Sequence, residues 1–294
     1  MQSLVVGASG IVGGYIVEQL LQRNLRPLAL SRSQHRSAEV DWWQGDLAAP
    51  QTLDLPPFDT VYCTADVGLL ATALPSIAQP SLKRVVAFTS TSILTKINSE
   101  IPAERAMIKG LAEGERRLIL VCEDLGIEWT ILRPTIIYAE GRDGNISRLA
   151  RFIRRFGFFP LLGTGAGLRQ PVHAKDLAQG ALDAAASGWT ANQIYSVPGG
   201  EIVSYHEMVG RVFDGLGKPR RMLHVPSLLW KVAFRLAKPF LPNANVSMGS
   251  RMEKDMIFDA TPAIRDFGWK PRVFRPVFDK GTMFGNCEHR RNAI

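Results

Sequence analysis

The stretch SLVVGASGIVGG at residues 3–14 decides the fold expected of this chain. It opens with a short apolar run, which is typical of a buried parallel strand. Apolar residues then recur at four-residue steps as far as Leu20, which predicts a helix that begins directly after the glycines. Gly7, Gly10 and Gly13 give the G-x-x-G-x-x-G spacing that lets a backbone approach a pyrophosphate at a helix N-terminus. We therefore expect a dinucleotide site at this turn.

Strand-like and helix-like segments alternate through the first half of the chain. After the glycine turn, apolar runs that predict strands lie at residues 26–31, 40–46, 58–65, 83–92 and 127–138. This alternation predicts an α/β fold, a Rossmann-type doubly wound parallel sheet with a smaller C-terminal substrate-binding region. We expect residues 1–140 to form the NAD(P)-binding domain and residues 141–294 to form mainly the substrate-binding region. Elements near 170–200 are expected to return to the sheet.

Composition narrows the function further. Apolar residues make up 46% of the chain and charged residues 21%, as is usual for a globular enzyme. No apolar stretch reaches the roughly 18 residues of a membrane span, and no basic leader precedes the first strand, so we expect a cytoplasmic protein. The net charge of +8 favours a small anionic substrate, whereas the lack of a nucleic-acid motif argues against a nucleic-acid partner. Cysteines and histidines show no metal-ligand spacing, so no metal is predicted.

One stretch raises the question of a surface partner. Residues 227–241 are apolar, with Lys231, Arg235 and Lys238 recurring on one side. A basic amphipathic helix of this kind can lie on a membrane surface, cap a substrate region or form a subunit contact. Because a buried core alone explains such an apolar face, membrane contact is the weaker interpretation. A homodimer remains open.

The residue that follows the second predicted strand distinguishes the two nicotinamide dinucleotides. An acid at this place binds the adenosine ribose and favours NAD, whereas an arginine accommodates a 2′-phosphate. Here Arg32 follows the strand, with Arg36 nearby and no acid between them. A guanidinium suits a phosphate dianion, so we expect NADP(H), with NAD(H) as the alternative if Arg32 only points to solvent.

These motifs resemble those of the extended short-chain dehydrogenase/reductase family, and within it the NAD-dependent epimerase/dehydratase branch that works on nucleotide sugars. Besides the glycine turn, the resemblance rests on segments at residues 45–47, 64–65, 88–91, 132–138, 163–177 and 266–271. It implies a set of cofactor-binding residues: Gly7, Ser9, Gly10, Ile11, Val12, Gly13, Arg32, Asp46, Leu47, Thr64, Ala65, Thr89, Pro134 and Ile136.

The resemblance also implies two substrate-binding residues. Arg169 stands in LRQPVHAKDL, residues 168–177, at the position of the arginine that grips a substrate diphosphate in the family. A bidentate guanidinium matches the oxygens of a phosphate. Asn145 stands where relatives often place a substrate-binding amide. A structural ion pair of Arg169 with Asp176 or another acid is the alternative.

The family's catalytic pair, Tyr-x-x-x-Lys, is missing. Thr91 matches the family's hydroxyl, which polarises the reacting carbonyl. Lys109 precedes Glu113 by four residues, as the family's lysine often precedes a glutamate, but Arg105 then takes the place of the tyrosine. Arginine cannot replace it, because its pKa above about 12 prevents proton transfer near neutral pH.

A second alignment, which matches Glu115 instead, puts Met107 at the tyrosine position and Leu111 at the lysine position. Three explanations then remain open. The protein binds cofactor without classical hydride chemistry, it recruits another acid/base, with Tyr138, His173 and Lys96 as candidates, or the substrate itself supplies the acid/base. We expect an NAD(P)-dependent oxidoreductase or epimerase/dehydratase-like protein that acts on a nucleotide-linked or other anionic substrate. A non-catalytic NADP(H)-binding sensor or assembly protein is the alternative.

Overall fold

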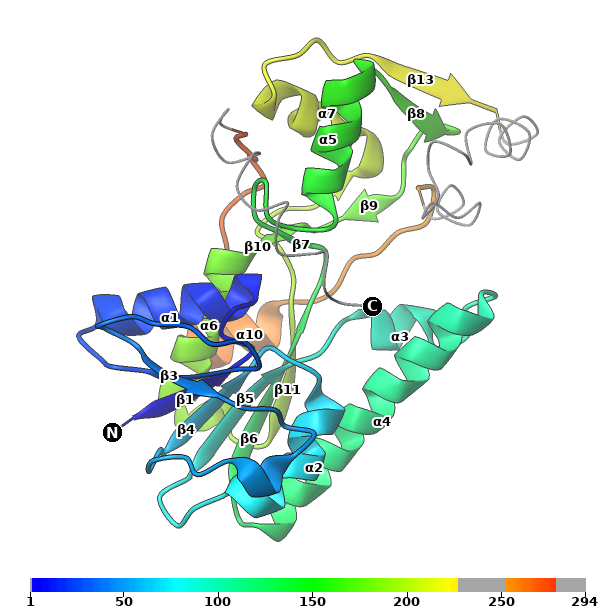
Figure 1. Cartoon of the computed structure of the whole chain (residues 1–294). Coiled ribbons are helices and arrows are strands. Elements are labelled where there is room, and N and C mark those ends of the chain that lie inside the picture. Colours follow the sequence, from blue (N-terminus) through cyan, green and yellow to red (C-terminus); the bar gives the residue numbers. More distant parts are fainter. Residues whose placement is uncertain (1, 227–251, 279–294) are drawn as a thin grey trace. The chain divides into compact units, whose positions relative to one another are not determined.

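The computed structural model describes residues 2–226 and 252–278, which divide into two compact units (Figure 1). Unit 1 comprises Met1–Thr135, Ala174–Pro198 and Phe258–Pro271, and unit 2 comprises Ile136–His173, Gly199–Ile257 and Arg272–Ile294. The division thus falls after Thr135, five residues before the expected boundary. Phe258–Pro271 returns to unit 1 in addition to the segment near residues 170–200.

Unit 1 is built on a seven-stranded sheet in which every pair of neighbours is parallel. The strand order is β11-β6-β5-β4-β1-β2-β3, so the order reverses between β1 and β4. The strands are β1 (Ser3–Val6), β2 (Leu28–Ser31), β3 (Asp41–Gln44), β4 (Thr60–Cys63), β5 (Arg84–Phe88), β6 (Glu128–Pro134) and β11 (Gln193–Val197). This is the doubly wound Rossmann architecture expected from the sequence, and such sheets bind ligands at the carboxyl ends of the strands beside the reversal.

Helices cover both faces of this sheet (Figure 1). The two long pairs are α1 (Ile11–Gln22) with α6 (Ala174–Ala186), and α2 (Val67–Ile77) with α4 (Pro102–Asp124). The shorter elements are α3 (Ser92–Lys96), α10 (Thr261–Phe267), η1 (Pro50–Thr52) and η2 (Gly188–Thr190). Fully buried strand residues such as Leu4, Val61 and Val85 pack against α2 and α4 in one apolar cluster. Burial on both faces is the reason for the continuous apolar runs in the sequence.

Unit 2 is assembled from short elements around its own apolar core. Among its described residues, three pairs of strands, β7–β10, β9–β12 and β8–β13, accompany the helices α5 and α7. Their bounds are β7 (Ile137–Tyr138), α5 (Ile146–Phe156), β8 (Phe159–Leu162), β9 (Leu168–Arg169), β10 (Val172–His173), β12 (Val203–Ser204), α7 (Tyr205–Gly215) and β13 (Met222–Val225). Tyr138, Ile153, Leu161, Phe213 and Phe274 lie at the centre of the core.

No helix in the described part of the chain is both long enough and apolar enough to cross a bilayer. The stretch at residues 227–241, for which surface contacts were considered, lies outside the described residues.

Candidate functional site

The glycine turn joins β1 to α1 in a conformation that only glycine satisfies. Gly7 has a φ of +80°, in the left-handed region. The N–H of Gly10 donates to the carbonyl of Gly7 at 2.8 Å and closes the turn. A Cβ added to Gly13 would lie 2.2 Å from the Gly7 carbonyl oxygen, so a side chain there would force helix and turn apart. The spacing of the three glycines therefore follows from the close approach of α1 to β1.

The N-terminus of α1 leaves its first N–H groups available to an anion. Gly10 caps the helix without a side-chain hydrogen bond, and the first turn contains no acid. Ser9 and Gly10 are exposed, and Ile11 and Val12 begin the helix behind them. A helix end of this kind combines unpaired N–H donors with the positive end of the helix dipole.

Thr64, at the end of β4, holds the turn in place. Its hydroxyl lies 3.1 Å from the carbonyl oxygens of both Val6 and Gly7 and donates to this pair. A Cβ on Gly7 would lie 2.6 Å from the same hydroxyl oxygen, which shows how closely β4 approaches the turn. Ala65 follows at the same edge of the sheet. The resemblance implied that Thr64 and Ala65 bind cofactor; the structure places them directly beside the glycine turn.

Arg32 lies at the carboxyl end of β2 with an exposed side chain. Its carbonyl accepts a hydrogen bond from Gln44 Nε2 at 3.2 Å, and the Ser31 hydroxyl accepts one from the Ser33 N–H at 3.2 Å. These two hydrogen bonds hold the backbone at the end of β2 without the guanidinium of Arg32. Within the described residues, neither Arg32 nor the exposed Arg36 forms a side-chain hydrogen bond or ion pair.

Asp46 and Leu47 continue this edge after β3. The Asp46 carboxylate accepts a hydrogen bond from the Ala48 N–H at 3.0 Å, and the side chain of Leu47 is buried in the core of unit 1. Gly45, before them, donates to the carbonyl of Ser31 at 2.9 Å and so keeps the segment beside β2. Leu47 therefore anchors the loop, and Asp46 fixes its turn.

A buried ion pair lies at the carboxyl ends of β5 and β6. Glu115 of α4 is 5% exposed and accepts hydrogen bonds from Thr89 Oγ1 at 2.7 Å and from Arg133 Nε at 3.1 Å. A second guanidinium nitrogen of Arg133 completes a bidentate contact. The contacts of Glu115 with Thr89 and Arg133 were not among the features expected from the sequence. The sequence feature that could have indicated this cluster is the second alignment, in which Glu115 matches the family's glutamate.

The cluster distinguishes the two alignments of α4. Glu113 is exposed and pairs only with Arg116 along the helix, at 2.8 Å, whereas Glu115 faces the sheet. Leu111, four residues before Glu115, is half-buried on the same side of the helix, whereas Met107, eight residues before it, is 64% exposed. The structure thus favours the alignment in which methionine and leucine occupy the positions of the tyrosine and lysine.

Lys109 and Arg105, which belong to the alignment that matches Glu113, do not join the cluster around Glu115. Lys109 is exposed, and Arg105 donates to the carbonyl of Ser99 at 2.9 Å. No tyrosine anywhere in the chain is followed by a lysine four residues later. The hydroxyl of Thr91 is buried and donates to the carbonyl of Pro134 at 3.0 Å, although its lone pairs remain able to accept.

Tyr138 and Ile136 belong to unit 2, whereas Thr91 and Lys109 belong to unit 1. Tyr138 is 1% exposed, and its ring meets those of His173 and Phe274 edge-on, each at 5.0 Å between centroids. His173 Nε2 lies 3.1 Å from a carboxylate oxygen of Glu140. The structure therefore places Tyr138 in an aromatic core beside a His–Glu pair.

Arg169 is 2% exposed, and one of its terminal nitrogens donates to the carbonyls of Leu168 at 2.6 Å and Lys254 at 2.7 Å. Its guanidinium carbon lies 5.5 Å from the ring centroid of Tyr205. Burial lowers the pKa of Arg169. Asn145 is exposed and donates to the carbonyl of Ile137 at 3.1 Å. Arg169 thus supports the backbone of unit 2, whatever ligand it also contacts.

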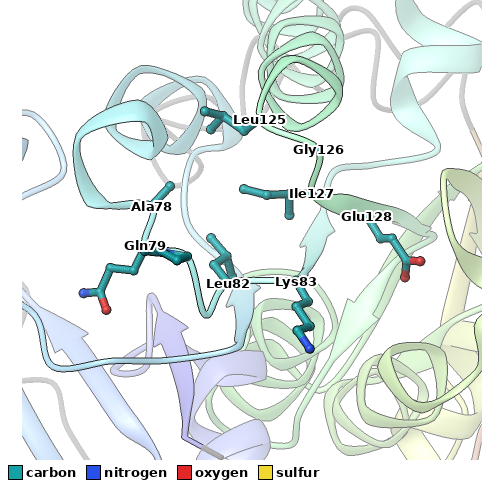
Figure 2. A pocket seen from close by; sticks show the side chains of 9 residues that line it. Ala78, Gln79, Leu82, Lys83, Leu125, Gly126, Ile127 and Glu128 are labelled. Carbon is teal, nitrogen blue, oxygen red and sulfur yellow. The ribbon is translucent and has the colours of Figure 1, made fainter.

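Two other features of the described residues do not belong to a catalytic site. Cys63 and Cys122 are buried, and burial raises the pKa of each thiol to about 12, so neither is a reactive thiolate. Figure 2 shows a hollow of about 610 Å³ lined by residues that include Ala78, Lys83 and Gly126. It lies where β5 and β6 begin, at the opposite end of these strands from Thr89 and Pro134.

Comparisons with known proteins, like the geometry of the glycine turn, indicate an NAD(P)H-binding domain. A family model described as NAD(P)H-binding matches residues 7–151. UDP-glucose 4-epimerase of Vibrio cholerae is 27% identical over 160 residues, which cover 54% of this chain and 47% of that protein. Mitochondrial NADH dehydrogenase [ubiquinone] 1 alpha subcomplex subunit 9 of Arabidopsis thaliana is 22% identical over 258 residues. That match covers 80% of this chain and 62% of the relative, so the chain spans less than two thirds of either protein.

Solved structures share the fold over nearly the whole chain. UDP-glucose 4-epimerase of Thermotoga maritima, solved with UDP-glucose, has a TM-score of 0.68 at 15% identity and covers 93% of this chain and 94% of its own. UDP-glucuronic acid 4-epimerase of Bacillus cereus, solved with UDP-glucuronic acid and NAD, has a TM-score of 0.71 at 14% identity, with coverage of 93% and 95%. With its glycine turn and strand order, the chain has an NAD(P)H-binding domain and shares the fold of these epimerase structures.

Proposed function

We propose that unit 1 binds NADP(H) along the carboxyl edge of its sheet. The observation that supports this choice is the exposed guanidinium of Arg32, which has no partner among the described residues and stands where an acid would favour NAD. The N–H groups at the start of α1 would hold the pyrophosphate, and Arg32, with Arg36 nearby, would hold the 2′-phosphate. When bound, the nicotinamide supplies hydride transfer.

The proposed reaction is an oxidoreductase or epimerase/dehydratase-like conversion of a nucleotide-linked or other anionic substrate. Two observations support this substrate class: the net charge of +8, and the UDP-sugars held by solved structures of the same fold. The conversion would proceed without a tyrosine-dependent proton transfer, because Met107 and Leu111 stand at the tyrosine and lysine positions of the alignment that matches Glu115. Neither side chain gains or loses a proton.

A second candidate function is non-catalytic binding of NADP(H). The contacts of the residues on and beside α4 favour it. The hydroxyl of Thr91 donates to Pro134, and no acid/base replaces the missing tyrosine within the described part of α4 that faces the sheet. Glu115 on that side is held by Arg133 and Thr89. The two functions share the cofactor and differ in turnover.

Cofactor choice is tested with Arg32→Ala and the matched variant Arg36→Ala. We expect Arg32→Ala to weaken NADP(H) binding by about 1–3 kcal/mol, the usual effect of losing a hydrogen bond to a charged group, and to leave NAD(H) binding unchanged. Arg36→Ala should have a smaller effect because it lies farther from the end of β2. Calorimetry with both dinucleotides measures the difference. Equal losses for the two cofactors would contradict a 2′-phosphate contact.

Turnover is tested by restoring the pair in each alignment. Met107→Tyr with Leu111→Lys rebuilds Tyr-x-x-x-Lys on the side of α4 that carries Glu115, whereas Arg105→Tyr rebuilds it with Lys109. If a phenol is what the site lacks, the first variant should raise NADP(H)-dependent turnover of UDP-sugars by about 100-fold, the lower range for a general acid/base, and the second should not. High turnover by the unaltered protein that survives Thr91→Ala would instead show that other groups transfer the proton.

A further inference from the structure

Helix α5 of unit 2 presents a row of unpaired positive charges. The sequence contains no aspartate or glutamate from Gly144 to Lys175, and α5 contains four arginines. Arg148, Arg151 and Arg155 follow one another at steps of three and four residues, which places them on one side of the helix. All three are exposed, and none forms a hydrogen bond or ion pair with another described residue. We call these three residues the α5 basic face.

The apolar side of α5 holds the helix in place without the basic face. Ile146, Ala150 and Ile153 occupy the opposite side and are buried in the core of unit 2, which is sufficient to hold α5 in place. Like charges three or four residues apart repel one another, and a cation in the first turn of a helix opposes the helix dipole. Arg155, in the last turn, is favoured by the dipole, but Arg148 and Arg151 bring the helix no such gain, which indicates a role outside the fold.

The neighbouring helix does not neutralise this charge. α5 and α7 pack together in unit 2, and α7 contains Glu207 and Asp214. Arg220 donates to Glu207 at 2.8 Å and to Asp214 at 2.9 Å, and Arg211 donates to Glu207 at 2.9 Å. The carboxylates of α7 are thus engaged within their own cluster.

Phenylalanines border the basic face at the C-terminal end of α5. Phe156 is 40% exposed, and its ring lies 4.6 Å from that of Phe152, which in turn lies 6.1 Å from Phe158. The guanidinium of Arg155 lies 5.5 Å from the ring centroid of Phe156. We call these three phenylalanines the aromatic edge.

Two further basic residues lie close to this edge. Lys218 donates to the carbonyl of Arg154 at 3.5 Å, and the carbonyl of Arg221 accepts from the N–H of Phe159 at 2.9 Å. The side chain of Arg221 is exposed. Positive charge and partly exposed aromatic rings are therefore combined on one surface of unit 2.

We propose that the α5 basic face and the aromatic edge bind the surface of an anionic lipid bilayer. Arginines attract acidic headgroups, and each basic residue near such a surface contributes about 1 kcal/mol. The exposed ring of Phe156, with the half-buried rings of Phe152 and Phe158 beside it, can enter the boundary between headgroups and acyl chains, which a phosphate-only ligand would not require. The surface lies wholly in unit 2 and uses no residue of the proposed cofactor site.

The test measures sedimentation of the full chain with phosphatidylcholine vesicles, with and without phosphatidylglycerol. Arg151→Glu with Arg155→Glu reverses two charges of the basic face. Lys83→Glu with Lys270→Glu, at exposed lysines of unit 1, changes the net charge by the same amount and serves as the control. We expect the wild type to bind only the anionic vesicles, the first variant to bind at least about tenfold more weakly, and the control to bind as the wild type does. Thermal unfolding confirms that each variant is folded.

Three further results bear on the proposal. Phe156→Ser should weaken the binding that remains at high salt, because lipid insertion is not screened. Equal losses in the two charge variants, or a loss that appears only with Lys231→Gln, Arg235→Gln and Lys238→Gln together, would overturn the proposal. Binding to duplex DNA or single-stranded RNA without binding to anionic vesicles would also overturn it, and would assign the surface to nucleic acid.

Discussion

Two arginines, Arg32 after β2 in unit 1 and Arg169 in β9 of unit 2, differ in exposure and in hydrogen bonding. Arg32 is exposed and has no partner among the described residues, whereas Arg169 is 2% exposed and donates to two carbonyls. The difference lies in the surrounding backbone. At the end of β2, the side chains of Ser31 and Gln44 form hydrogen bonds with the backbone. The guanidinium of Arg32 therefore stays available to a ligand. In unit 2, the carbonyl of Lys254 accepts from Arg169, and the carbonyl of Leu168 accepts from both Arg169 and the Met256 N–H.

The comparison separates arginines that maintain the fold from arginines that can bind. Arg133 belongs to the first group, because its guanidinium is held by the buried carboxylate of Glu115. Arg36 belongs with Arg32, since both lie exposed on the loop after β2. If this division is right, removing a partner from the first group should destabilise the protein, and removing a member of the second should affect only ligands.

Glu115→Ala should give the largest effect. The substitution leaves Arg133 largely buried without its carboxylate and removes the acceptor of the Thr89 hydroxyl. Breaking a buried pair in this way costs about 3–5 kcal/mol of the free energy of unfolding. Urea denaturation measures the loss. Glu113→Ala, two residues away, is the matched control and should change little, because the Glu113–Arg116 pair is exposed. Similar losses in the two variants would show that Glu115 is not the interior partner.

Arg169→Ala should have the next largest effect, again on stability. It removes the Arg169 donor from the carbonyl of Lys254, whereas the carbonyl of Leu168 still accepts from the Met256 N–H, and an unsatisfied buried polar group costs about 1–3 kcal/mol. Arg32→Ala is the control and should change the free energy of unfolding by less than about 0.5 kcal/mol, as surface substitutions usually do. If Arg169→Ala unfolds at the same urea concentration as the wild type yet loses stabilisation by UDP-sugars, Arg169 is a substrate clamp and not a support of the backbone.

Sequence reasoning succeeded where the chemistry is local. Gly7, Gly10 and Gly13 lie within one turn, and their spacing already reports how closely α1 approaches β1. The parallel sheet followed from apolar runs at regular intervals. Partners that are distant in the sequence could not be predicted in this way: Arg169 meets the carbonyl of Lys254, 85 residues later. The sequence did not show which of Glu113 and Glu115 faces the sheet. The packing of α4 on the sheet distinguished them.

Glu140→Gln should have the smallest effect, and its size should depend on pH. Burial opposes ionisation of Glu140, but the hydrogen bond to His173 and backbone N–H donors outweigh it, so the pKa of Glu140 is lowered from 4.5. A carboxyl whose pKa is lower in the folded state stabilises the protein above its unfolded pKa and loses that contribution as the pH falls through the folded value. Glu140→Gln should therefore cost about 1 kcal/mol or less at neutral pH, and the difference should close below pH 4.5. Urea denaturation at pH 7 and pH 3 measures both points. A cost that is the same at the two pH values would mean that Glu140 acts through its shape and hydrogen bonds and not through its charge.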